Sequence, residues 1–353
     1  MKVFLLSRYG PLGASSRIRS YQYLPYLKAH GIDVTVSPLL GNDYLRKFYS
    51  GRVNHRNARL APYSQRLIKL LKSRRFDLLW IEKELFPWLP SWCEMLIARL
   101  GIPYIVDYDD AIFHSYDTHS NIFVRKFLGN KIDTVMRNAA LVTAGNEYLM
   151  ARAEKAGARR VEYLPTVIDL KRYSVKDNTK NSVFTIGWIG SPMTVKYLEM
   201  IRPVFSEWDK KNNACLVIIG DDSFKLDGIN VEYRSWSHES EVSDIQTFDV
   251  GIMPLPNNLW EKGKCGYKLI QYMACGKPVI ASPVGVNSKI VEHGVNGFLA
   301  SSKKEWIESL ELLYADPERR YEMGKEGRRK VENNYCVQIT APRLLDLMSS
   351  CVS

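Results

Sequence analysis

The fold is best predicted from the stretch Glu261 to Ala300, EKGKCGYKLIQYMACGKPVIASPVGVNSKIVEHGVNGFLA. Its glycine-punctuated start leads into a short helix expected over residues 267–274, and Gly276 is typical of the position just past a last helical turn. Two lysines, Lys264 and Lys268, stand beside the start of this helix. Free backbone N–H groups, the helix dipole and ammonium groups together favour a bound phosphate. The alternative is that both lysines are simply solvated.

The segment Gln271–Ser282, QYMACGKPVIAS, resembles the EAMAxGxPVIAS signature of the family 4 retaining glycosyltransferases of the GT-B fold. Gly294–Leu299 resembles the GxxGxL that closes the same family motif. The family's two glutamates, eight residues apart, are absent here. Gln271 takes the place of the second, Gly263 takes that of the first, and Glu261 lies two positions earlier.

Length and composition are those of a soluble protein with two domains. The chain has 353 residues, 46% of them hydrophobic and 25% charged, which exceeds one ordinary core and fits two. The apolar part of residues 1–10 is too short for a signal sequence, and no apolar run approaches the roughly 18 residues of a membrane span. Six cysteines without CxxC spacing indicate neither a zinc site nor a disulfide framework. We expect a cytosolic protein.

The net charge of +11 lies entirely in the first half of the chain. Residues 1–165 hold 25 Lys and Arg against 14 Asp and Glu, so 25 − 14 = +11, and the remainder balances at 24 of each. Tyr44 to Arg75 carries ten of these basic residues, interleaved with apolar ones, and no acidic residue. Such a segment favours peripheral contact with an anionic membrane. The alternative is a packed helix with a solvated basic face. No nucleic-acid-reading motif accompanies the charge, so nucleic acid is not an expected partner.

Alternating strands and helices predict two parallel sheets, each covered on both faces. In the first half, strands are expected at 2–7, 32–36, 76–81, 103–107, 140–144 and 161–164, and helices at 17–28, 88–100, 121–138 and 147–156. In the second half, strands are expected at 184–190, 216–219, near 231, 250–253, 278–281 and 297–299, and helices at 195–210, 239–246, 267–274 and from 303 onward. The first strand–turn–helix unit has no GxGxxG, so dinucleotide binding is not supported.

This alternation and the resemblance imply an α/β protein of the GT-B fold, with two Rossmann-like parallel-sheet domains facing each other across a cleft. Residues 1–168 would form the acceptor-binding domain and residues 181–335 the nucleotide-sugar-binding domain, joined by a polar linker. Residues 336–353 would form a C-terminal helix that crosses back and packs on the first domain.

The resemblance also assigns the donor site. Lys264 and Lys268 would stabilise the departing diphosphate, with Glu261 as a further catalytic candidate, and Gln271 would hold the nucleotide ribose. For Val286 the alternative is plain packing. The donor-binding candidates are Gly190, Ser191, Lys196, Gly266, Tyr267, Gln271, Gly285, Val286 and Asn287.

Acceptor candidates follow from the rule that ligands of open α/β sheets sit outside the carboxyl ends of strands. Asp109 is the catalytic candidate in the first domain, and helix capping is its alternative role. The Asp-x-Asp of residues 107–109 resembles a metal motif of a different glycosyltransferase fold, so we expect no metal and no cofactor here. The acceptor-binding candidates are Gly13, Ser15, Ser16, Arg17, Glu84, Asp110 and His114.

The expected function is metal-independent transfer of a sugar, with retention, from a nucleoside-diphosphate donor to a lipid-linked or polysaccharide acceptor in cell-envelope glycan synthesis. UDP is the favoured nucleotide and GDP the next. The protein would be cytoplasmic and peripheral at the inner face of the membrane. Two alternatives stay open: a GT-B-like UDP-sugar epimerase and a non-catalytic nucleotide-sugar binding protein.

Overall fold

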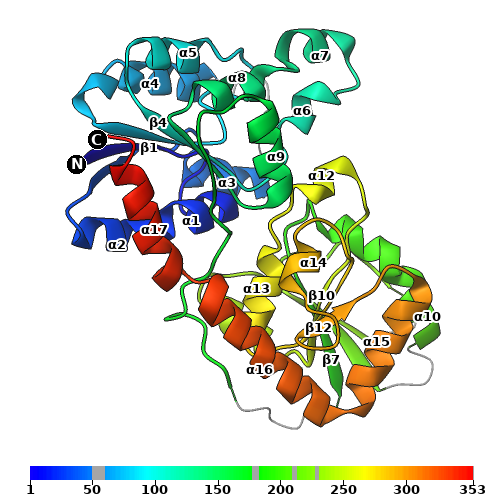
Figure 1. The fold of residues 1–353 in the computed structure, drawn as a ribbon. Helices are drawn as coiled ribbons and strands as arrows, with labels where there is room; N and C mark the ends of the chain where they lie inside the picture. Colours follow the sequence, from blue (N-terminus) through cyan, green and yellow to red (C-terminus); the bar gives the residue numbers. More distant parts are fainter. Residues whose placement is uncertain (50–59, 177–182, 209–212, 227–229, 353) are drawn as a thin grey trace. The chain divides into compact units, whose positions relative to one another are not determined.

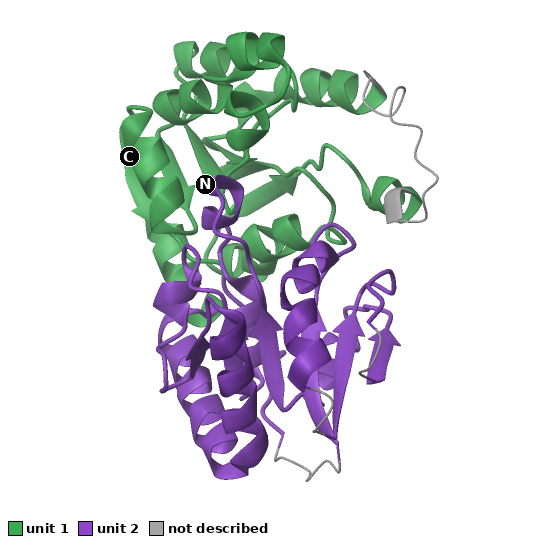
Figure 2. Ribbon diagram, turned by 90° about the vertical axis from the view of Figure 1, so that its right-hand side faces the viewer, with its two compact units in different colours: residues 1–166, 337–353 green, residues 167–336 purple. Residues whose placement is uncertain are grey.

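The computed structural model describes residues 1–49, 60–176, 183–208, 213–226 and 230–352 as an α/β structure (Figure 1). The chain divides into two compact units (Figure 2). Unit 1 comprises Met1–Thr166 and Val337–Ser353, and unit 2 comprises Val167–Cys336. Each unit is built on a six-stranded sheet whose strand pairs are all parallel. The expected fold class, two parallel-sheet α/β units, is therefore confirmed.

The sheet of unit 1 has the order β2-β1-β3-β4-β5-β6. Its strands are β1 Lys2–Leu6, β2 Asp33–Val36, β3 Leu78–Glu82, β4 Tyr104–Tyr108, β5 Leu141–Ala144 and β6 Val161–Tyr163. Its helices are α1 Ala14–Arg19, η1 Tyr21–Tyr23, α2 Leu24–Ala29, α3 Asn42–Tyr49, α4 Leu60–Leu70, η2 Ser73–Arg75, α5 Trp92–Arg99, α6 His114–Asp117, α7 Ile122–Leu128, α8 Lys131–Asn138, α9 Glu147–Lys155 and the C-terminal α17 Val337–Ser349.

Helices cover both faces of this sheet. Figure 1 shows α1, α2 and α17 on one side and α4, α5 and α8 on the other. The C-terminal helix α17 packs against α2 and η1, so the end of the chain returns to the first unit. Strands β3, β4 and β5 are buried at every position, as expected for parallel strands with helices on both faces.

Two helices expected in unit 1 are interrupted, and in each case a residue explains the break. The segment expected as a helix over 17–28, kinked or shortened at Pro25, forms α1, η1 and α2. Pro25 has no N–H to donate and lies in the first turn of α2. The segment expected as one helix over 121–138 forms α7 and α8. Gly129 is a poor helix former, and Asn130 takes the N-cap position of α8.

The sheet of unit 2 has the order β12-β11-β10-β7-β8-β9. Its strands are β7 Phe184–Ile189, β8 Ala214–Ile219, β9 Asn230–Arg234, β10 Val250–Met253, β11 Val279–Ala281 and β12 Gly297–Leu299. Its helices are η3 Val195–Ile201, α10 Arg202–Trp208, α11 Glu241–Ile245, α12 Leu259–Lys262, α13 Tyr267–Ala274, α14 Asn287–Ile290, α15 Lys303–Ala315 and α16 Pro317–Asn334. The segment expected as one α-helix over 195–210 begins as the 3₁₀-helix η3, because Pro203 cannot donate into a preceding turn.

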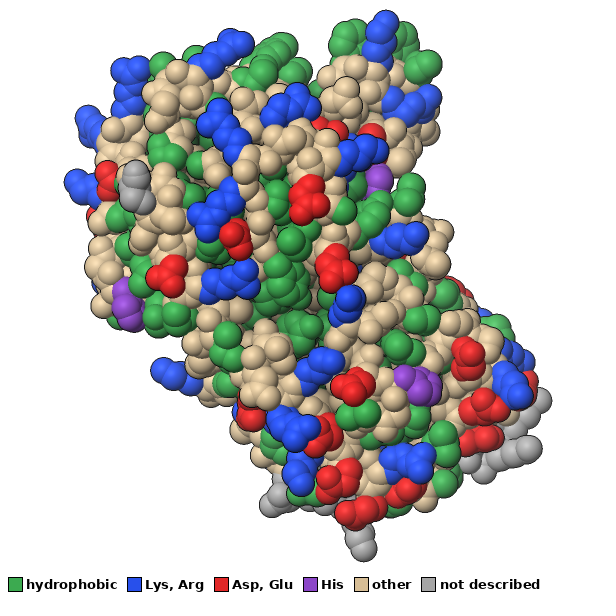
Figure 3. All heavy atoms as spheres, in the orientation of Figure 1, with side chains coloured by type: hydrophobic (Ala, Val, Ile, Leu, Met, Phe, Trp, Pro, Cys, Tyr) green, Lys and Arg blue, Asp and Glu red, His purple; other side chains and the backbone are tan. Residues whose placement is uncertain are grey.

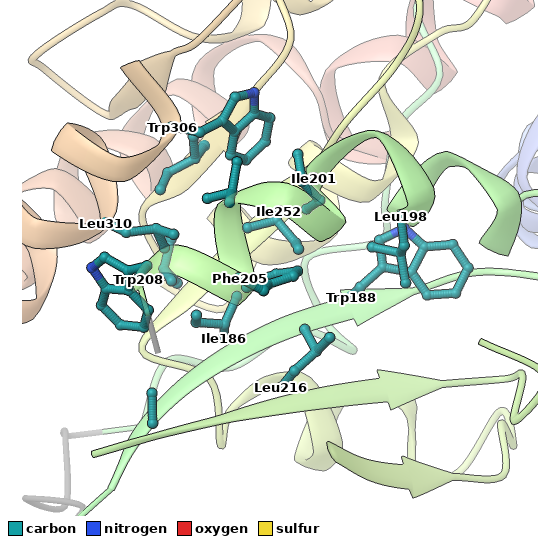
Figure 4. Close-up of a cluster of buried hydrophobic side chains, with 14 of the residues drawn as sticks. Ile186, Trp188, Leu198, Ile201, Phe205, Trp208, Leu216, Ile252, Trp306 and Leu310 are labelled. Carbon is teal, nitrogen blue, oxygen red and sulfur yellow. The ribbon is translucent and has the colours of Figure 1, made fainter. Parts of the chain in front are cut away.

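A buried cluster on one face of this sheet holds unit 2 together (Figure 4). Side chains of β7 and β8 point toward η3, α10 and α15, and Trp188, Phe205 and Trp208 are among its largest members. Burying an aromatic side chain of this size stabilises the fold by about 2–3 kcal/mol. The cluster therefore fixes β7, whose carboxyl end carries part of the candidate site.

Some of the expected features fall outside the described residues. Of the basic segment 44–75, residues 50–59, with Arg52, Arg56 and Arg59, lie outside them. So do residues 177–182, which include the end of the expected linker and the first two residues of the expected second domain. Within the described part of the chain, no helix is long and apolar enough to cross a membrane.

Candidate functional site

Each sheet contains one point at which the strand order reverses. In unit 2, β7 pairs with β8 on one side and with β10 on the other. In unit 1, β1 lies between β2 and β3 in the same way. Ligands of open α/β sheets bind in the crevice outside the carboxyl ends of strands at such a switch point. A ligand is therefore expected at the loops that follow β7 and β10 and at those that follow β1 and β3.

The two predicted phosphate lysines lie beside the start of α13. The Lys268 ammonium is 5.4 Å from the ring centroid of Trp188 on β7, and the Lys264 ammonium is 5.8 Å from that of Trp260. Both lysines are half-buried. Gly266, the N-cap of α13, has φ of 68°, a conformation that glycine adopts without strain. Lys268 thus connects the start of α13 with the end of β7, and Lys264 lies beside Trp260 in the segment between α12 and α13.

The turn after β7 contains the next two donor candidates. The Gly190 amide donates to the carbonyl of Ile219 at 3.0 Å, and a side chain at this position would clash with the Trp188 ring. The Ser191 amide donates to Thr194 Oγ1 at 3.2 Å, which closes the turn. Lys196 is exposed, with its ammonium 5.5 Å from the Tyr197 ring centroid. These contacts fix a compact turn at the switch point.

The segment 284–287 lies against the start of α13. A Cβ at Gly266 would contact both Val286 and Asn287 Oδ1. Gly285 has φ of 55° and no room for a side chain, since the Lys262 carbonyl would lie 2.7 Å from its Cβ. Asn287 is buried, and its Nδ2 donates to the Ser282 carbonyl at 3.1 Å. Its Oδ1 has no hydrogen-bond partner in the described structure. The structure therefore brings together Gly266, Gly285, Val286 and Asn287.

The two polar residues near the expected glutamate positions are occupied inside unit 2. Glu261 is buried and accepts a hydrogen bond from Tyr197 Oη at 2.7 Å. Gln271 is 2% exposed and donates from Nε2 to Tyr173 Oη at 3.1 Å. Tyr173 Oη in turn donates to Glu241 Oε1 at 2.6 Å. Burial, followed by the neighbouring Tyr267 and Glu241, raises the pKa of Tyr173 well above its ordinary value.

In unit 1 the carboxyl end of β3 presents three consecutive charged residues. Glu82 is buried, and its Oε2 accepts from the Arg8 amide at 2.9 Å and from Ser16 Oγ at 2.6 Å. Burial raises the pKa of Glu82. Ser16, an acceptor candidate, is thus used to hold the loop after β1 against β3. Gly13 closes the same loop, since its amide donates to the Gly10 carbonyl at 2.9 Å.

Lys83 connects β3 to the predicted carboxylates after β4. Its ammonium lies 2.8 Å from Asp109 Oδ1 and 3.8 Å from Asp110 Oδ2. Ser15 Oγ donates to Asp109 Oδ2 at 2.5 Å. Burial opposes ionisation of Asp109, but the charges of Lys83 and Arg19 and these hydrogen bonds lower its pKa to about 2. Asp109 is therefore a buried, charge-compensated carboxylate.

The remaining acceptor candidates are also tied into local contacts. Glu84 is buried and pairs with Lys131 and, at 3.4 Å, with Arg8; Tyr116 Oη donates to it at 2.9 Å. His114 shares hydrogen bonds of 2.8 Å with Asp117 and with Tyr148. Arg17 is half-buried and donates to the Pro11 carbonyl at 3.4 Å.

Three further basic residues belong to this cluster, namely Arg8, Lys83 and Lys131. Arg8 and Lys83 follow strands at places where the sequence predicts a ligand, although neither is an individual candidate, whereas Lys131 lies outside those places. The signal for Lys83 was its place between two glutamates at a strand end. Its φ of 66° is uncommon for a residue with a side chain and often marks a functional site. Lys131 lies 47 residues from its partner Glu84, so no local pattern could have paired them.

The Asp-x-Asp pair is neutralised by basic side chains. Asp107 receives two hydrogen bonds from the Arg19 guanidinium, at 2.9 and 2.6 Å, and one from Thr143 at 2.6 Å. Asp109 pairs with Lys83, as described above. Across the described residues, no group of three His, Cys, Asp or Glu side chains is placed to hold a metal ion.

Comparison with known proteins places this geometry in context. Residues 181–316 match the family described as Glycosyl transferases group 1. Unit 2 therefore carries a glycosyltransferase group 1 domain. It includes the turn after β7, the lysines beside α13 and the segment 284–287.

Two curated relatives match a short part of the chain. Spore coat protein SA of Bacillus subtilis is 35% identical over 78 residues, which are 21% of each chain. The D-inositol 3-phosphate glycosyltransferase of Pseudarthrobacter chlorophenolicus is 34% identical over 88 residues, 24% of this chain and 20% of the relative. The chain thus spans about a fifth of the length of the curated relatives it matches.

The fold comparison covers the whole chain. The crystal structure of Anabaena HepE in complex with UDP and glucose matches with a TM-score of 0.72 over 99% of this chain and 100% of that chain, at 15% sequence identity. At this identity the likeness shows the fold alone. The chain has a two-domain GT-B fold.

Proposed function

We propose that the chain is a retaining glycosyltransferase that moves a sugar from a nucleoside-diphosphate donor to a lipid-linked or polysaccharide acceptor in cell-envelope glycan synthesis. The observation that carries the proposal is the cluster in the group 1 domain. There the half-buried Lys264 and Lys268 flank the N-terminus of α13, and Lys268 lies over Trp188 at the end of β7. Positive groups gathered at a switch point are suited to a diphosphate.

The proposed chemistry is charge neutralisation at the leaving group. Cleavage of the bond between the sugar and the diphosphate develops negative charge on phosphate oxygens. Two ammonium groups and the positive end of α13 would stabilise that charge. By resemblance to the retaining GT-B enzymes, the acceptor reacts on the face that the diphosphate leaves, so no strong protein base is required. The lysines supply the positive charge for which other enzymes use a metal.

UDP is the proposed nucleotide and GDP the second choice. The similarly folded Anabaena HepE was solved with UDP and glucose, which supports UDP as the first ligand to test. The donor-binding residues would be those gathered around α13, among them Gly190, Gly266 and Gly285. Gln271 would contact the ribose only if the Tyr173 network opens to it.

A membrane-linked acceptor is supported by the position of the charge. Unit 1 carries the whole excess of +11, and the basic segment 44–75 belongs to it. We propose that this segment gives peripheral contact with the anionic inner face of a membrane, where the acceptor would lie. Asp109, Asp110, Glu84 and His114 would contact acceptor hydroxyls.

The first experiment is thermal stabilisation of the protein by UDP, GDP, ADP, CDP and NAD, with and without magnesium. A ligand at about 100 times its dissociation constant adds roughly 2.7 kcal/mol of stability, which is visible as a rise in Tm. We expect a rise with UDP that magnesium does not change. If none of the nucleotides raises the Tm, the donor assignment is wrong.

The lysine variants test the assignment of the site. Lys264→Ala and Lys268→Ala should each reduce the UDP shift and lower sugar transfer by about a hundredfold, because each removes a charge contact to the leaving group. Lys304→Ala is the matched control, since Lys304 is an exposed lysine of α15 in the same unit. Transfer that survives both substitutions unchanged would remove the phosphate role from these residues.

A non-catalytic nucleotide-sugar binding protein is the second candidate. The observation that favours it is the replacement of the family's second glutamate by Gln271, whose amide is already bonded to Tyr173. Incubation of the protein with UDP-glucose and a lipid extract distinguishes the transferase from the non-catalytic binding protein. Binding with neither transfer nor hydrolysis of the donor would favour the second candidate.

A further inference from the structure

The large exposed apolar side chains of unit 1 gather on three of its helices and their flanks. Among the residues described, α1, α2, α8 and α9 expose none, and α17 with the residues after it exposes Ile339 and Val352. The others lie on or next to α4, α5 and α7, here called the apolar edge: Leu67, Ile68, Leu71, Trp88, Leu89, Trp92, Leu96, Leu100, Ile122, Phe123 and Phe127. Figure 1 draws these three helices along the upper side of unit 1.

Helix α7 shows the feature most clearly. A surface helix ordinarily turns its apolar face inward. Here Ile122, Phe123 and Phe127 are 64%, 67% and 71% exposed, while Leu128 is buried. The side chain of Asn121 caps the helix by accepting from the Phe123 amide at 2.8 Å. Helix α7 thus buries Leu128 at its C-terminal end and presents its aromatic side chains outward.

Helix α5 repeats this arrangement. Trp92, Leu96 and Leu100 follow one another at intervals of four residues, so they form a single stripe, and all three are exposed. Glu94, the acidic residue of this helix, is buried and accepts from the Leu85 amide at 2.9 Å. The stripe therefore faces outward without a negative charge beside it.

Seven exposed basic side chains lie on or next to these helices, whereas Asp77, which accepts from the Lys2 amide, is the exposed acidic residue nearest to them in the described sequence. The basic residues are Lys69, Lys72, Arg74, Arg75, Arg99, Arg125 and Lys126. From Thr118 to Ile132 the sequence contains no acidic residue. Figure 3 shows green apolar and blue basic side chains over the part of unit 1 where Figure 1 labels α7.

We propose that the apolar edge docks unit 1 on an anionic lipid bilayer, with Phe123, Phe127 and Trp92 inserted among the headgroups and the basic side chains on lipid phosphates. Exposed aromatic and aliphatic side chains flanked by Lys and Arg are the composition that binds this interface. A second copy of the chain fits less well, because a two-fold interface would bring the same positive charges together. The inference rests on the membrane-facing function proposed above and adds α5 and α7 to it.

The test is co-flotation of the whole chain with vesicles of phosphatidylcholine alone and with an equal mixture of phosphatidylcholine and phosphatidylglycerol. Wild type should float with the mixture. Phe123→Ser/Phe127→Ser should lower its partition coefficient at least about tenfold, because two inserted side chains are lost. Ile339→Ser is the matched control, since it removes an exposed apolar side chain of unit 1 that lies on α17. Arg125→Gln/Lys126→Gln should weaken the preference for the anionic mixture without abolishing it, because five of the seven basic side chains remain.

Three results would overturn the inference. Wild type that does not float with the anionic mixture, or a Phe123/Phe127 variant that floats as wild type does, excludes insertion. If sedimentation shows that the wild type is a dimer without lipid and that the Phe123/Phe127 variant is a monomer, the apolar edge is an interface with a second copy of the chain. The Tm and the UDP shift are measured on every variant. A variant that keeps the UDP shift but no longer floats has an intact donor site. A variant that still floats but has lost the UDP shift has an intact docking surface.

Discussion

The charged residues at the switch point of unit 1 are arranged in compensating pairs. Asp109 has Lys83 and Ser15, Asp107 has Arg19, and Glu84 has Lys131. A buried carboxylate without such a partner would be protonated rather than charged. The pairs therefore keep Asp109 ionised next to residues that an acceptor could contact.

Asp109 makes stability depend on pH in a direction that can be worked out. Its pKa is about 2 in the folded chain, whereas the pKa of an Asp in an unfolded chain is about 3.9. A lowered pKa means that the carboxylate stabilises the fold above about pH 4 and that this contribution disappears as the pH falls through about 2. Asp109→Asn should cost about 3 kcal/mol at pH 7, because it leaves Lys83 buried without its closest charge partner.

Urea unfolding of wild type and Asp109→Asn between pH 7 and about pH 2 measures the difference. The gap between the two proteins should shrink across the lower part of that range. Asp43→Asn is the control, since Asp43 pairs with Arg46 at the surface with its side chain 87% exposed, and exposed pairs contribute little. A gap that stays constant with pH would show that the Asp109 charge is not what stabilises the site.

Among the helices, α13 and α16 pack closely through two glycines of α16. A Cβ at Gly324 would clash with the Gly276 carbonyl just past α13, and one at Gly327 would lie 2.9 Å from Met273 Cγ. Glycine within a helix costs about 1 kcal/mol relative to alanine. The close approach explains why glycine stands there, and it fixes α13 and hence Lys268.

Gly324→Ala separates helix propensity from packing. Propensity alone would stabilise α16 by about 1 kcal/mol, but the methyl group must push α16 away from a backbone carbonyl. Overpacking of this kind costs about 1–3 kcal/mol or more, so we expect a lower Tm. Gly41→Ala is the control, because nothing lies within 4 Å of its Cβ position. A Tm of the Gly324 variant that equals or exceeds that of wild type would contradict this packing.

The sequence predicted helices and strands best where an apolar pattern ends at a glycine or a proline. Helix α13 and the strand β10 have the expected bounds, since apolar runs end at glycine or proline there. The breaks at Pro25 and Gly129 and the 3₁₀ start of η3 before Pro203 have local causes, because proline lacks an N–H and glycine is a poor helix former, but the exact bounds of the flanking helices depend on how the chain packs. The site shows the same limit, because Gln271 and Tyr173 are 98 residues apart and their hydrogen bond has no local signature.

At the scale of the whole molecule, charge and apolar exposure coincide in unit 1. The excess of +11 lies in residues 1–165, and the edge formed by α4, α5 and α7 lies in the same unit. Unit 2, with the group 1 domain, holds nearly balanced charge. The two units therefore divide the proposed work, with one directed to the donor and the other to a charged surface.

This division predicts that salt weakens vesicle binding by unit 1 more than it weakens UDP binding by unit 2. Raising NaCl from about 50 mM to about 500 mM shortens the Debye length from about 14 Å to about 4 Å. Flotation with phosphatidylglycerol vesicles should then fall at least about tenfold, because several Lys and Arg contacts with lipid are screened together. The UDP shift should change much less, since half-buried lysines at short range are screened weakly. If both fall in parallel, or if flotation resists salt, the charge of unit 1 does not direct the chain to the membrane.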